Sequence, residues 1–362
     1  MEDKGKIQKF LESLDLDKRG KVLIGASLFV LLISALGLYI FVFAPDLSWL
    51  RREEVPVVEV PVEEVPIPEE VCADCQPRWL DGVTVSSTQA LAFPVAVVID
   101  NDILARPQAG LSKASLVYEA PVEGGITRYL AVFPADVDIS EVGPVRSARP
   151  YFVSWAEEIG ALYIHVGGSP EALDQIRAAN LFDLNEFFNG SYFKRNASRP
   201  APHHVMIGAD SWRSYLDRRG LVETSAEPWL FKEEGDHATS SADINLQFSL
   251  SYRPMWRYDA ENNDYQRFFN GEESKDGEDD IRAKNIIIQN VDSRVLDAAG
   301  RLRLDVIGTG EAAICQDGVC SDGTWRKSGR NRTRFYYENG EEIKLNPGMT
   351  WIEVADGNTR VN

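Results

Sequence analysis

An unbroken apolar run near the N-terminus constrains this chain more than any other feature of its sequence. Residues 22–44 contain no charged side chain. A helix rises about 1.5 Å per residue, so this run spans about 34 Å and can cross the ~30 Å hydrocarbon core of a bilayer. The alternative is a cleaved signal peptide, but its apolar region is usually about 7–15 residues long. No cysteine directly follows the run to accept a lipid. The run therefore predicts an uncleaved transmembrane helix.

The residues on either side of this run predict how it is oriented. Six basic side chains lie within residues 1–21, whereas only Arg51 and Arg52 closely follow the span. Because basic flanks stay in the cytoplasm, we expect a cytoplasmic tail (1–21), a single pass through the cell membrane and an extracytoplasmic body. Residues 45–78 carry nine acidic side chains and repeated prolines, which is typical of a semi-rigid stalk.

The charge of the body excludes a nucleic acid partner. The 362 residues include 38 Lys and Arg against 56 Asp and Glu, a net charge of −18, of which residues 79–362 carry −13. Nucleic acid binding requires a surplus of Lys and Arg on the binding domain. The membrane is therefore the partner that the sequence predicts most directly.

Two different patterns of apolar and polar residues in the body predict two domains and an α+β fold class. Residues 79–240 alternate short apolar runs with helix-like stretches, which indicates an α+β domain. Residues 241–362 are rich in short strand-like runs and hairpin turns, which indicates a mostly antiparallel β domain. In the first domain we expect strands at 93–99, 128–133 and 162–166, and helices at 108–114, 150–158 and 171–179. In the second we expect strands at 248–252, 255–258, 265–269, 285–289, 302–306, 333–337 and 350–354. The acidic stretch 272–280 is expected to be a solvated loop.

Four cysteines form two close pairs. Outside the membrane an oxidising environment favours disulfides. The Asp317-Gly318 turn would pair Gln316 with Val319 and place Cys315 opposite Cys320, which predicts a cross-strand disulfide. Cys72 and Cys75 form a second pair, which could be a local bridge, a redox site or a metal site.

The polar side chains that could take part in catalysis or ligand binding are concentrated in the first predicted domain. Asp100 ends a buried strand and His165 interrupts another, so the two are candidate catalytic residues for acid–base work. Three arginines could form a fork for a phosphate or carboxylate, and the helix after Gly167-Gly168 would add free N–H groups. The candidate ligand-binding residues are Asn101, Glu119, Arg128, Arg146, Ser147, Arg149 and Ser169. Glu123, Arg195, Arg199, His203 and His204 belong to the same cluster.

Structural roles are the alternative for each of these residues. The arginines can pair with Glu119, Glu123 or Glu141 in networks that only stabilise the fold, and a histidine within a strand often bonds a backbone carbonyl. The sequence contains no G-x-S-x-G, H-E-x-x-H or phosphate-binding loop motif. We therefore expect neither a cofactor nor a metal.

Several motifs resemble those of the YerB-like family of bacterial envelope proteins, a domain of unknown function. The similar segments are 94–101, 106–111, 117–119, 123–128, 142–151 and 165–172, with a thinner match at 323–325, 333–335, 345–348 and 350–351. The resemblance covers most of residues 80–356. It implies a two-domain protein attached to a bacterial membrane on its outer side, and it supplies no activity. Several relatives look like lipoproteins anchored through an N-terminal cysteine, whereas this chain carries the apolar run.

Two functional hypotheses follow from these features. The first is a membrane-anchored envelope protein that binds an anionic cell-wall or lipid-linked ligand, or a partner protein. The second is a hydrolase or transferase that acts on an envelope substrate, with Asp100 and His165 as acid and base and Arg146 and Arg149 stabilising negative charge. The second hypothesis requires that these residues and Arg128 share one pocket.

Overall fold

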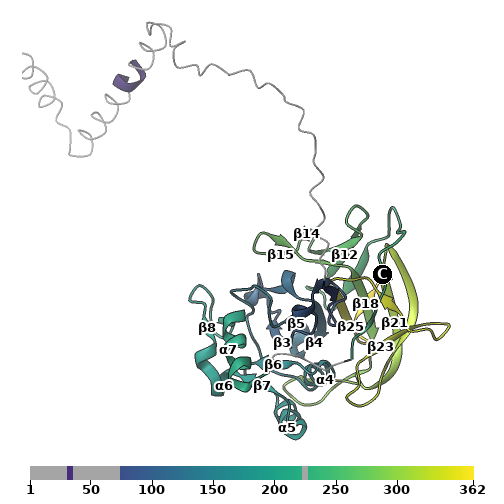
Figure 1. The fold of residues 1–362 in the computed structure, drawn as a ribbon. Coiled ribbons are helices and arrows are strands. Elements are labelled where there is room, and N and C mark those ends of the chain that lie inside the picture. The colour runs from purple at the N-terminus through teal and green to yellow at the C-terminus, as the bar shows by residue number, and fades with distance from the viewer. Residues whose placement is uncertain (1–30, 36–73, 222–226) are drawn as a thin grey trace, which may run out of the picture. The chain divides into compact units, whose positions relative to one another are not determined.

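The computed structural model describes residues 31–35, 74–221 and 227–362, and the described residues from 74 onward belong to one compact unit (Figure 1). The predicted transmembrane span lies outside the described residues except for 31–35, which are helical. No helix within the described ranges is long and apolar enough to cross a membrane. The predicted stalk also lies outside them up to residue 73, and its last residues form β1 (Cys75–Pro77), which pairs with β2 (Thr84–Ser86). The folded body therefore begins before residue 79.

A ten-stranded mixed sheet runs through the middle of the body. Its strands come from both predicted domains, because β25 lies parallel to both β4 and β18. The change in sequence pattern near residue 240 therefore lies within one compact unit. In spatial order the strands are β23 (Arg334–Tyr337), β22 (Val319–Lys327), β21 (Gly308–Gln316), β18 (Asn285–Asn290), β25 (Thr350–Ala355), β4 (Leu116–Pro121), β5 (Thr127–Pro134), β3 (Pro94–Asp100), β6 (Leu162–His165) and β7 (Asp183–Asn185).

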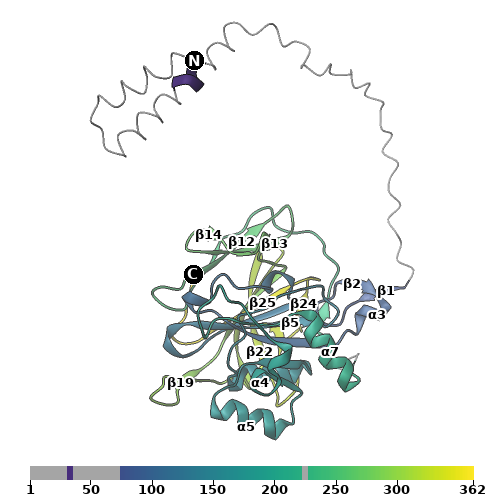
Figure 2. The same ribbon diagram turned by 90° about the vertical axis from the view of Figure 1, so that its left-hand side faces the viewer.

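Both faces of this sheet are covered, which explains why its central strands are continuous apolar runs. In β3, Val95, Val97 and Ile99 enter one core, and Ala96 and Val98 enter the other. A six-stranded sheet packs on the first face, and α4 and α5 pack on the second (Figure 2). The six-stranded sheet consists of β14 (Glu272–Glu273), β13 (Asp264–Phe269), β12 (Pro254–Asp259), β11 (Ile244–Gln247), β26 (Arg360–Val361) and β17 (Arg282–Ala283).

Short helices and strand pairs complete the body. The helices are α3 (Ser87–Ala90), α4 (Pro150–Ile159), α5 (Pro170–Ala179), α6 (Glu186–Asn189) and α7 (Ala209–Arg219), with single 3-10 turns η2 (Ile103–Ala105), η3 (Leu111–Lys113), η4 (Glu123–Gly125) and η5 (Gly190–Tyr192). The small strand pairs are β8 (Lys194–Arg195) with β9 (Val205–Met206), β10 (Leu230–Phe231) with β24 (Lys344–Leu345), β15 (Lys275–Asp276) with β16 (Asp279–Asp280), and β19 (Ser293–Val295) with β20 (Leu302–Leu304).

The mixed α/β first part and the β-rich second part agree with the sequence prediction, and most predicted elements are present. Two are wrong. The expected helix at 108–114 is only the turn η3, since Gly110 adopts a left-handed φ of 96° that a helix cannot contain. The expected strand at 248–252 is a turn, in which the Phe248 N–H donates to the Tyr252 carbonyl.

The acidic stretch 272–280 is more structured than a solvated loop. It contains β14, β15 and β16, and the Asp276 carboxylate accepts hydrogen bonds from the backbone N–H groups of Gly110 and Ser112. The predicted disulfide is confirmed: Cys315 lies opposite Cys320 on β21 and β22, with Cα atoms 4.0 Å apart. Cys75 is also disulfide-bonded, and Cys72 lies outside the described residues.

A buried ionic network joins the large sheet to the six-stranded sheet. Arg267 of β13 donates to Glu119 of β4 at 2.8 Å and to the Tyr252 hydroxyl at 2.7 Å, and Tyr252 in turn donates to Glu119 at 2.6 Å. Glu353 of β25 lies beside Glu119 in the parallel register and accepts a hydrogen bond from Trp256. Burial and the neighbouring Glu119 carboxylate raise the pKa of Glu353 well above its ordinary value. Glu353 therefore keeps its proton to a higher pH than an ordinary glutamate does.

The raised pKa of Glu353 predicts a pH dependence of stability. The folded chain keeps the Glu353 proton to a higher pH than the unfolded chain, which loses it above a pH of about 4.3. The free energy of unfolding should thus fall as pH rises, by at most about 1.4 kcal/mol per pH unit from this group. Glu353→Gln should flatten the fall between pH 5 and pH 7.5 in urea denaturation. The exposed Glu311→Gln on β21 is the control; equal pH slopes for Glu353→Gln and the unsubstituted chain would contradict the assignment.

Candidate functional site

The carboxylate of Asp100 is the centre of one half of the predicted cluster. It lies at the buried end of β3, where Arg146 Nε is 2.9 Å and His203 Nδ1 is 2.7 Å from its Oδ2 atom. Arg128, the cross-strand neighbour of Asp100 in β5, approaches the other oxygen at 4.0 Å. Two arginines and one histidine therefore share a single buried carboxylate.

Glu123 organises the other half of the cluster. Both of its carboxylate oxygens accept hydrogen bonds from Arg149, and Arg128 Nη2 donates to Oε1 at 3.4 Å. Burial alone would raise the pKa of Glu123, but the hydrogen bonds from Arg149 and the charges of Arg128 and Arg149 lower it below its ordinary value. The three arginines of the predicted fork thus each have a carboxylate partner within the protein.

Asp100 and His165, the predicted catalytic pair, do not hydrogen-bond to each other. Both ring nitrogens of His165 have other partners, with Nδ1 2.7 Å from the Gly167 carbonyl and Nε2 3.1 Å from Asp183. The histidine that contacts Asp100 is His203. Asp100 and His203 are 103 positions apart in the sequence. The sequence indicated their proximity only by placing His203 in the same polar cluster. No local spacing could have paired them.

The remaining predicted ligand-binding residues have structural partners. Asn101 Nδ2 donates to Thr127 at 2.7 Å and to Glu119, so Asn101 and Glu119 belong to the buried network described above. The Ser169 hydroxyl accepts from the Ala172 N–H as the N-cap of α5, in agreement with the helix start predicted there. The Ser147 carbonyl accepts from Arg128.

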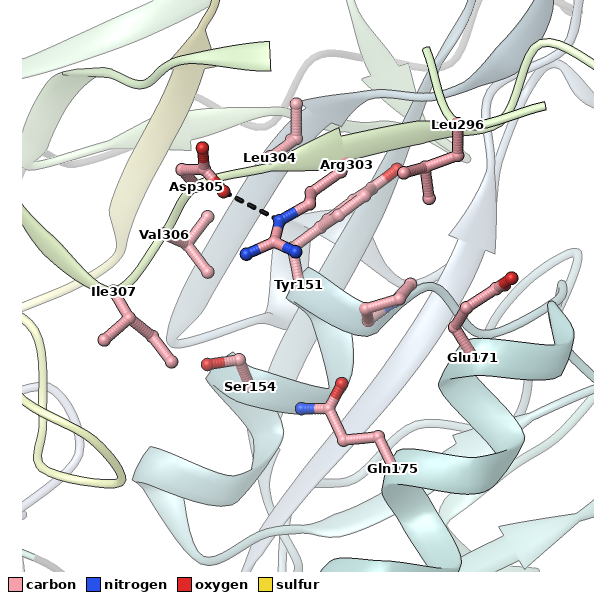
Figure 3. A pocket seen from close by; sticks show the side chains of 11 residues that line it. Tyr151, Ser154, Glu171, Gln175, Leu296, Arg303, Leu304, Asp305, Val306 and Ile307 are labelled. Atoms are coloured by element: carbon pink, nitrogen blue, oxygen red, sulfur yellow. Dashed lines mark hydrogen bonds and ion pairs between the residues drawn. The ribbon is translucent and has the colours of Figure 1, made fainter. Parts of the chain in front are cut away.

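A groove with a volume of about 740 Å³ lies beside this cluster (Figure 3). It lies between the first turns of α4 and α5 on one side and β20 with its flanking residues on the other, and we call it the α4–α5 groove. Figure 3 shows the Arg303 guanidinium in the middle of the groove, paired with Asp305 at 2.9 Å. The lining residues are Pro150, Tyr151, Ser154, Glu171, Gln175, Leu296, Arg303, Leu304, Asp305, Val306 and Ile307.

The groove and the arginine cluster are neighbours in the fold. Pro150 and Tyr151 line the groove and directly follow Arg149, the N-cap residue of α4. On the opposite side, the loop between β19 and β20 brings Gly300 to Glu123, where a Cβ on the glycine would lie 3.9 Å from the Glu123 Cβ. The guanidinium groups of the arginine cluster are therefore close to the end of the groove that Tyr151 lines.

The groove offers both polar and apolar contacts. Tyr151, Ser154, Gln175 and Glu171 come from the helices, and Leu304, Val306 and Ile307 from the opposite wall. In the ranges 74–221 and 227–362, no group of three or more His, Cys, Asp or Glu side chains is placed to hold a metal ion. The groove therefore combines hydroxyl, amide and charged groups on the helix side with mainly apolar side chains on the opposite wall.

Comparison with known proteins gives the family. Residues 80–222 match the family described as "Protein of unknown function (DUF3048) N-terminal domain", and residues 244–352 match the corresponding C-terminal domain. The chain belongs to this YerB-like family. The predicted resemblance is therefore confirmed over both parts of the body, including the motifs that hold Asp100, Glu123 and the arginines.

Relatives in Bacillus subtilis support this membership. The chain is 31% identical to "Putative lipoprotein YerB" over 270 residues, which cover 72% of this chain and 81% of that protein. The crystal structure of YerB from the same organism matches with a TM-score of 0.71 at 28% identity, covering 78% of this chain and 98% of the other. A family with a lipoprotein among its relatives is consistent with an envelope protein.

Proposed function

We propose that this chain is a membrane-tethered protein of the bacterial cell envelope that binds an anionic cell-wall or lipid-linked glycan in the α4–α5 groove. Two features support the tether and its location. Residues 22–44 are an uncharged run long enough to span a bilayer, with the basic flank on the N-terminal side. The Bacillus subtilis relative carries the name "Putative lipoprotein YerB", which supports a membrane attachment in this family. The acidic, proline-rich composition of residues 45–78 supports a stalk between this tether and the body.

The position of Arg303 is the observation that carries the proposed ligand class. Its side chain is 56% exposed and its partner Asp305 is 45% exposed. Exposed ion pairs of this kind contribute only about 0–1 kcal/mol, so the guanidinium can exchange Asp305 for a ligand anion at little cost. A guanidinium donates two parallel hydrogen bonds to a carboxylate or phosphate. The buried arginines of the neighbouring cluster cannot do this without first losing Glu123 or Asp100.

The other walls of the groove fit a sugar polymer. A sugar ring presents hydroxyl groups at its edge and C–H groups on its faces. Ser154 and Gln175 supply hydrogen-bonding groups from α4 and α5, and Leu304, Val306 and Ile307 supply apolar contacts from the opposite side. The groove volume of about 740 Å³ exceeds that of a single sugar unit, so it can hold a segment of a longer chain.

The enzyme hypothesis has less support. It required Asp100 and His165 to act together, and both His165 ring nitrogens face other groups. The Asp100–His203 pair that occupies this place is buried and lacks an adjacent nucleophile among the hydrogen-bond partners that the described residues provide. We therefore favour binding over catalysis.

Arg303→Ala should weaken glycan binding about tenfold, because a hydrogen bond between charged groups contributes about 1.5–3 kcal/mol. The measurement is calorimetric titration of the full chain in detergent micelles with soluble peptidoglycan fragments and with glycerol phosphate oligomers. Arg257→Ala is the matched control, since Arg257 is 54% exposed and pairs with Asp243 at the same 2.9 Å distance, outside the groove. The proposal would be contradicted if neither probe binds. It would also be contradicted if Arg303→Ala and Arg257→Ala lose the same amount of glycan affinity.

The proposed tether predicts how the chain fractionates. The full chain should stay in the membrane pellet after carbonate and high-salt washes, because a transmembrane helix is held by apolar burial and not by charge. A chain that lacks residues 22–44 should move to the soluble fraction. Release of the full chain by either wash would show that residues 22–44 do not span the membrane.

A further inference from the structure

A second cavity adjoins the α4–α5 groove at the start of β21. Its volume is about 450 Å³, and its walls are the first residues of β21 together with residues at the ends of β18 and β25. Asp305 and Ile307 line both this cavity and the groove. We call it the β21 cavity. A chain-like ligand bound in the groove can therefore continue past Ile307 into the β21 cavity.

The groove and the β21 cavity differ in charge. The groove has the Arg303 guanidinium in its middle, whereas the described lining of the β21 cavity contains four carboxylates and no Lys, Arg or His. The four are Asp292, Asp305, Glu311 and Asp356. Asp292 and Glu311 are exposed, and neither takes part in an ion pair within the described residues. Of the four, only Asp305 at the border with the groove has a cationic partner there.

Asp356 is the buried member of this set. It is 7% exposed, and its carboxylate accepts hydrogen bonds from the Ser293 hydroxyl at 2.6 Å and from the Asn358 side chain at 3.2 Å. Burial alone would raise the pKa of Asp356, but these hydrogen bonds lower it below its ordinary value. Because the donors are neutral, Asp356 keeps its negative charge, and salt screens a buried charge less than an exposed one.

Ligand binding in the groove adds to this negative charge. Arg303 is the ion-pair partner of Asp305, and in the proposed function an anionic group of the ligand takes the place of Asp305. The released Asp305 carboxylate remains in the wall that the groove shares with the β21 cavity. The unit of the ligand next to the anionic group therefore meets four carboxylates.

We propose that the ligand is a glycan in which charged and neutral sugar units alternate: one anionic group binds Arg303, and the neighbouring neutral unit occupies the β21 cavity. This inference rests on the proposed function of the groove. Carboxylates accept hydrogen bonds from sugar hydroxyl groups, and the exposed Thr309 adds a hydroxyl that can donate or accept.

The charge of the β21 cavity also defines what the site rejects. A second anionic group in this cavity would be repelled by the four carboxylates. The substrate class is thus a peptidoglycan-type polymer with a carboxylate on alternate sugars, and not a poly(glycerol phosphate) with a phosphate on every unit.

Calorimetric titration of the full chain in detergent micelles tests this preference. The probes are soluble peptidoglycan fragments with a carboxylate on alternate sugars, and glycerol phosphate oligomers of matched length. The unsubstituted chain should bind the peptidoglycan fragments more tightly, by about threefold or more at low ionic strength, because like charges a few ångströms apart repel each other even in water.

The double variant Asp292→Asn with Glu311→Gln removes two of the four charges. It should raise the affinity for the glycerol phosphate oligomers about threefold and change the affinity for the peptidoglycan fragments less than about twofold. The gain should shrink as salt is added, because salt screens exposed charges. A gain in affinity cannot arise from loss of the fold.

Glu261→Gln with Glu278→Gln is the control double variant. Both glutamates are exposed and line neither cavity, and their replacement changes the net charge of the chain by the same amount, so both affinities should stay unchanged. This inference alone is overturned if the oligomers bind the unsubstituted chain as tightly as the fragments do. It is also overturned if Asp292→Asn with Glu311→Gln raises the oligomer affinity no more than the control does. If neither probe binds, the proposed function fails and this inference fails with it.

Discussion

The ion pair between Arg267 and Glu119 is the interaction on which the arrangement of the two sheets depends. The two residues are 148 positions apart, and they meet where the six-stranded sheet packs on the large sheet. Their buried charges lose hydration, and the hydrogen bonds from Tyr252, Asn101 and Thr127 to Glu119 offset part of that loss. Removing one partner of such a pair costs about 3–5 kcal/mol, since it leaves an unpaired buried charge.

Different polar clusters lie on the two faces of the large sheet. On the face that meets the six-stranded sheet, Asn101 bonds both Glu119 and Arg106, and the Tyr252 ring, whose hydroxyl bonds the ion pair, contacts the Arg106 guanidinium. On the opposite face, Asp100 and Glu123 neutralise three arginines close to the helices. An acidic body can bury these arginines because each finds a carboxylate, and the exposed Arg303 remains to meet a ligand.

Local sequence patterns were sufficient to predict the features that depend on interactions between residues close in sequence. Ser169 and Pro170 predicted the start of α5, and the Asp317-Gly318 turn predicted the Cys315–Cys320 disulfide, because caps and tight turns involve neighbouring residues. The wrong helix at 108–114 also has a local cause, since the left-handed Gly110 lies in its middle.

Contacts between distant segments could not be predicted in the same way. Hydrophobic periodicity marks β25 and β18 as strands, but it does not say that they are neighbours in one sheet. The pairing of Asp100 with His203 and the position of Arg303 opposite α4 and α5 arise from such long-range packing. For that reason the polar cluster was recognised from the sequence, whereas the groove beside it was not.

A crystal structure of the chain grown with a soluble anionic glycan is the most direct test of the account. We expect the glycan between α5 and β20, with a carboxylate or phosphate oxygen about 3 Å from the Arg303 guanidinium and Asp305 displaced from it. A glycan bound elsewhere while the α4–α5 groove stays empty would contradict the account.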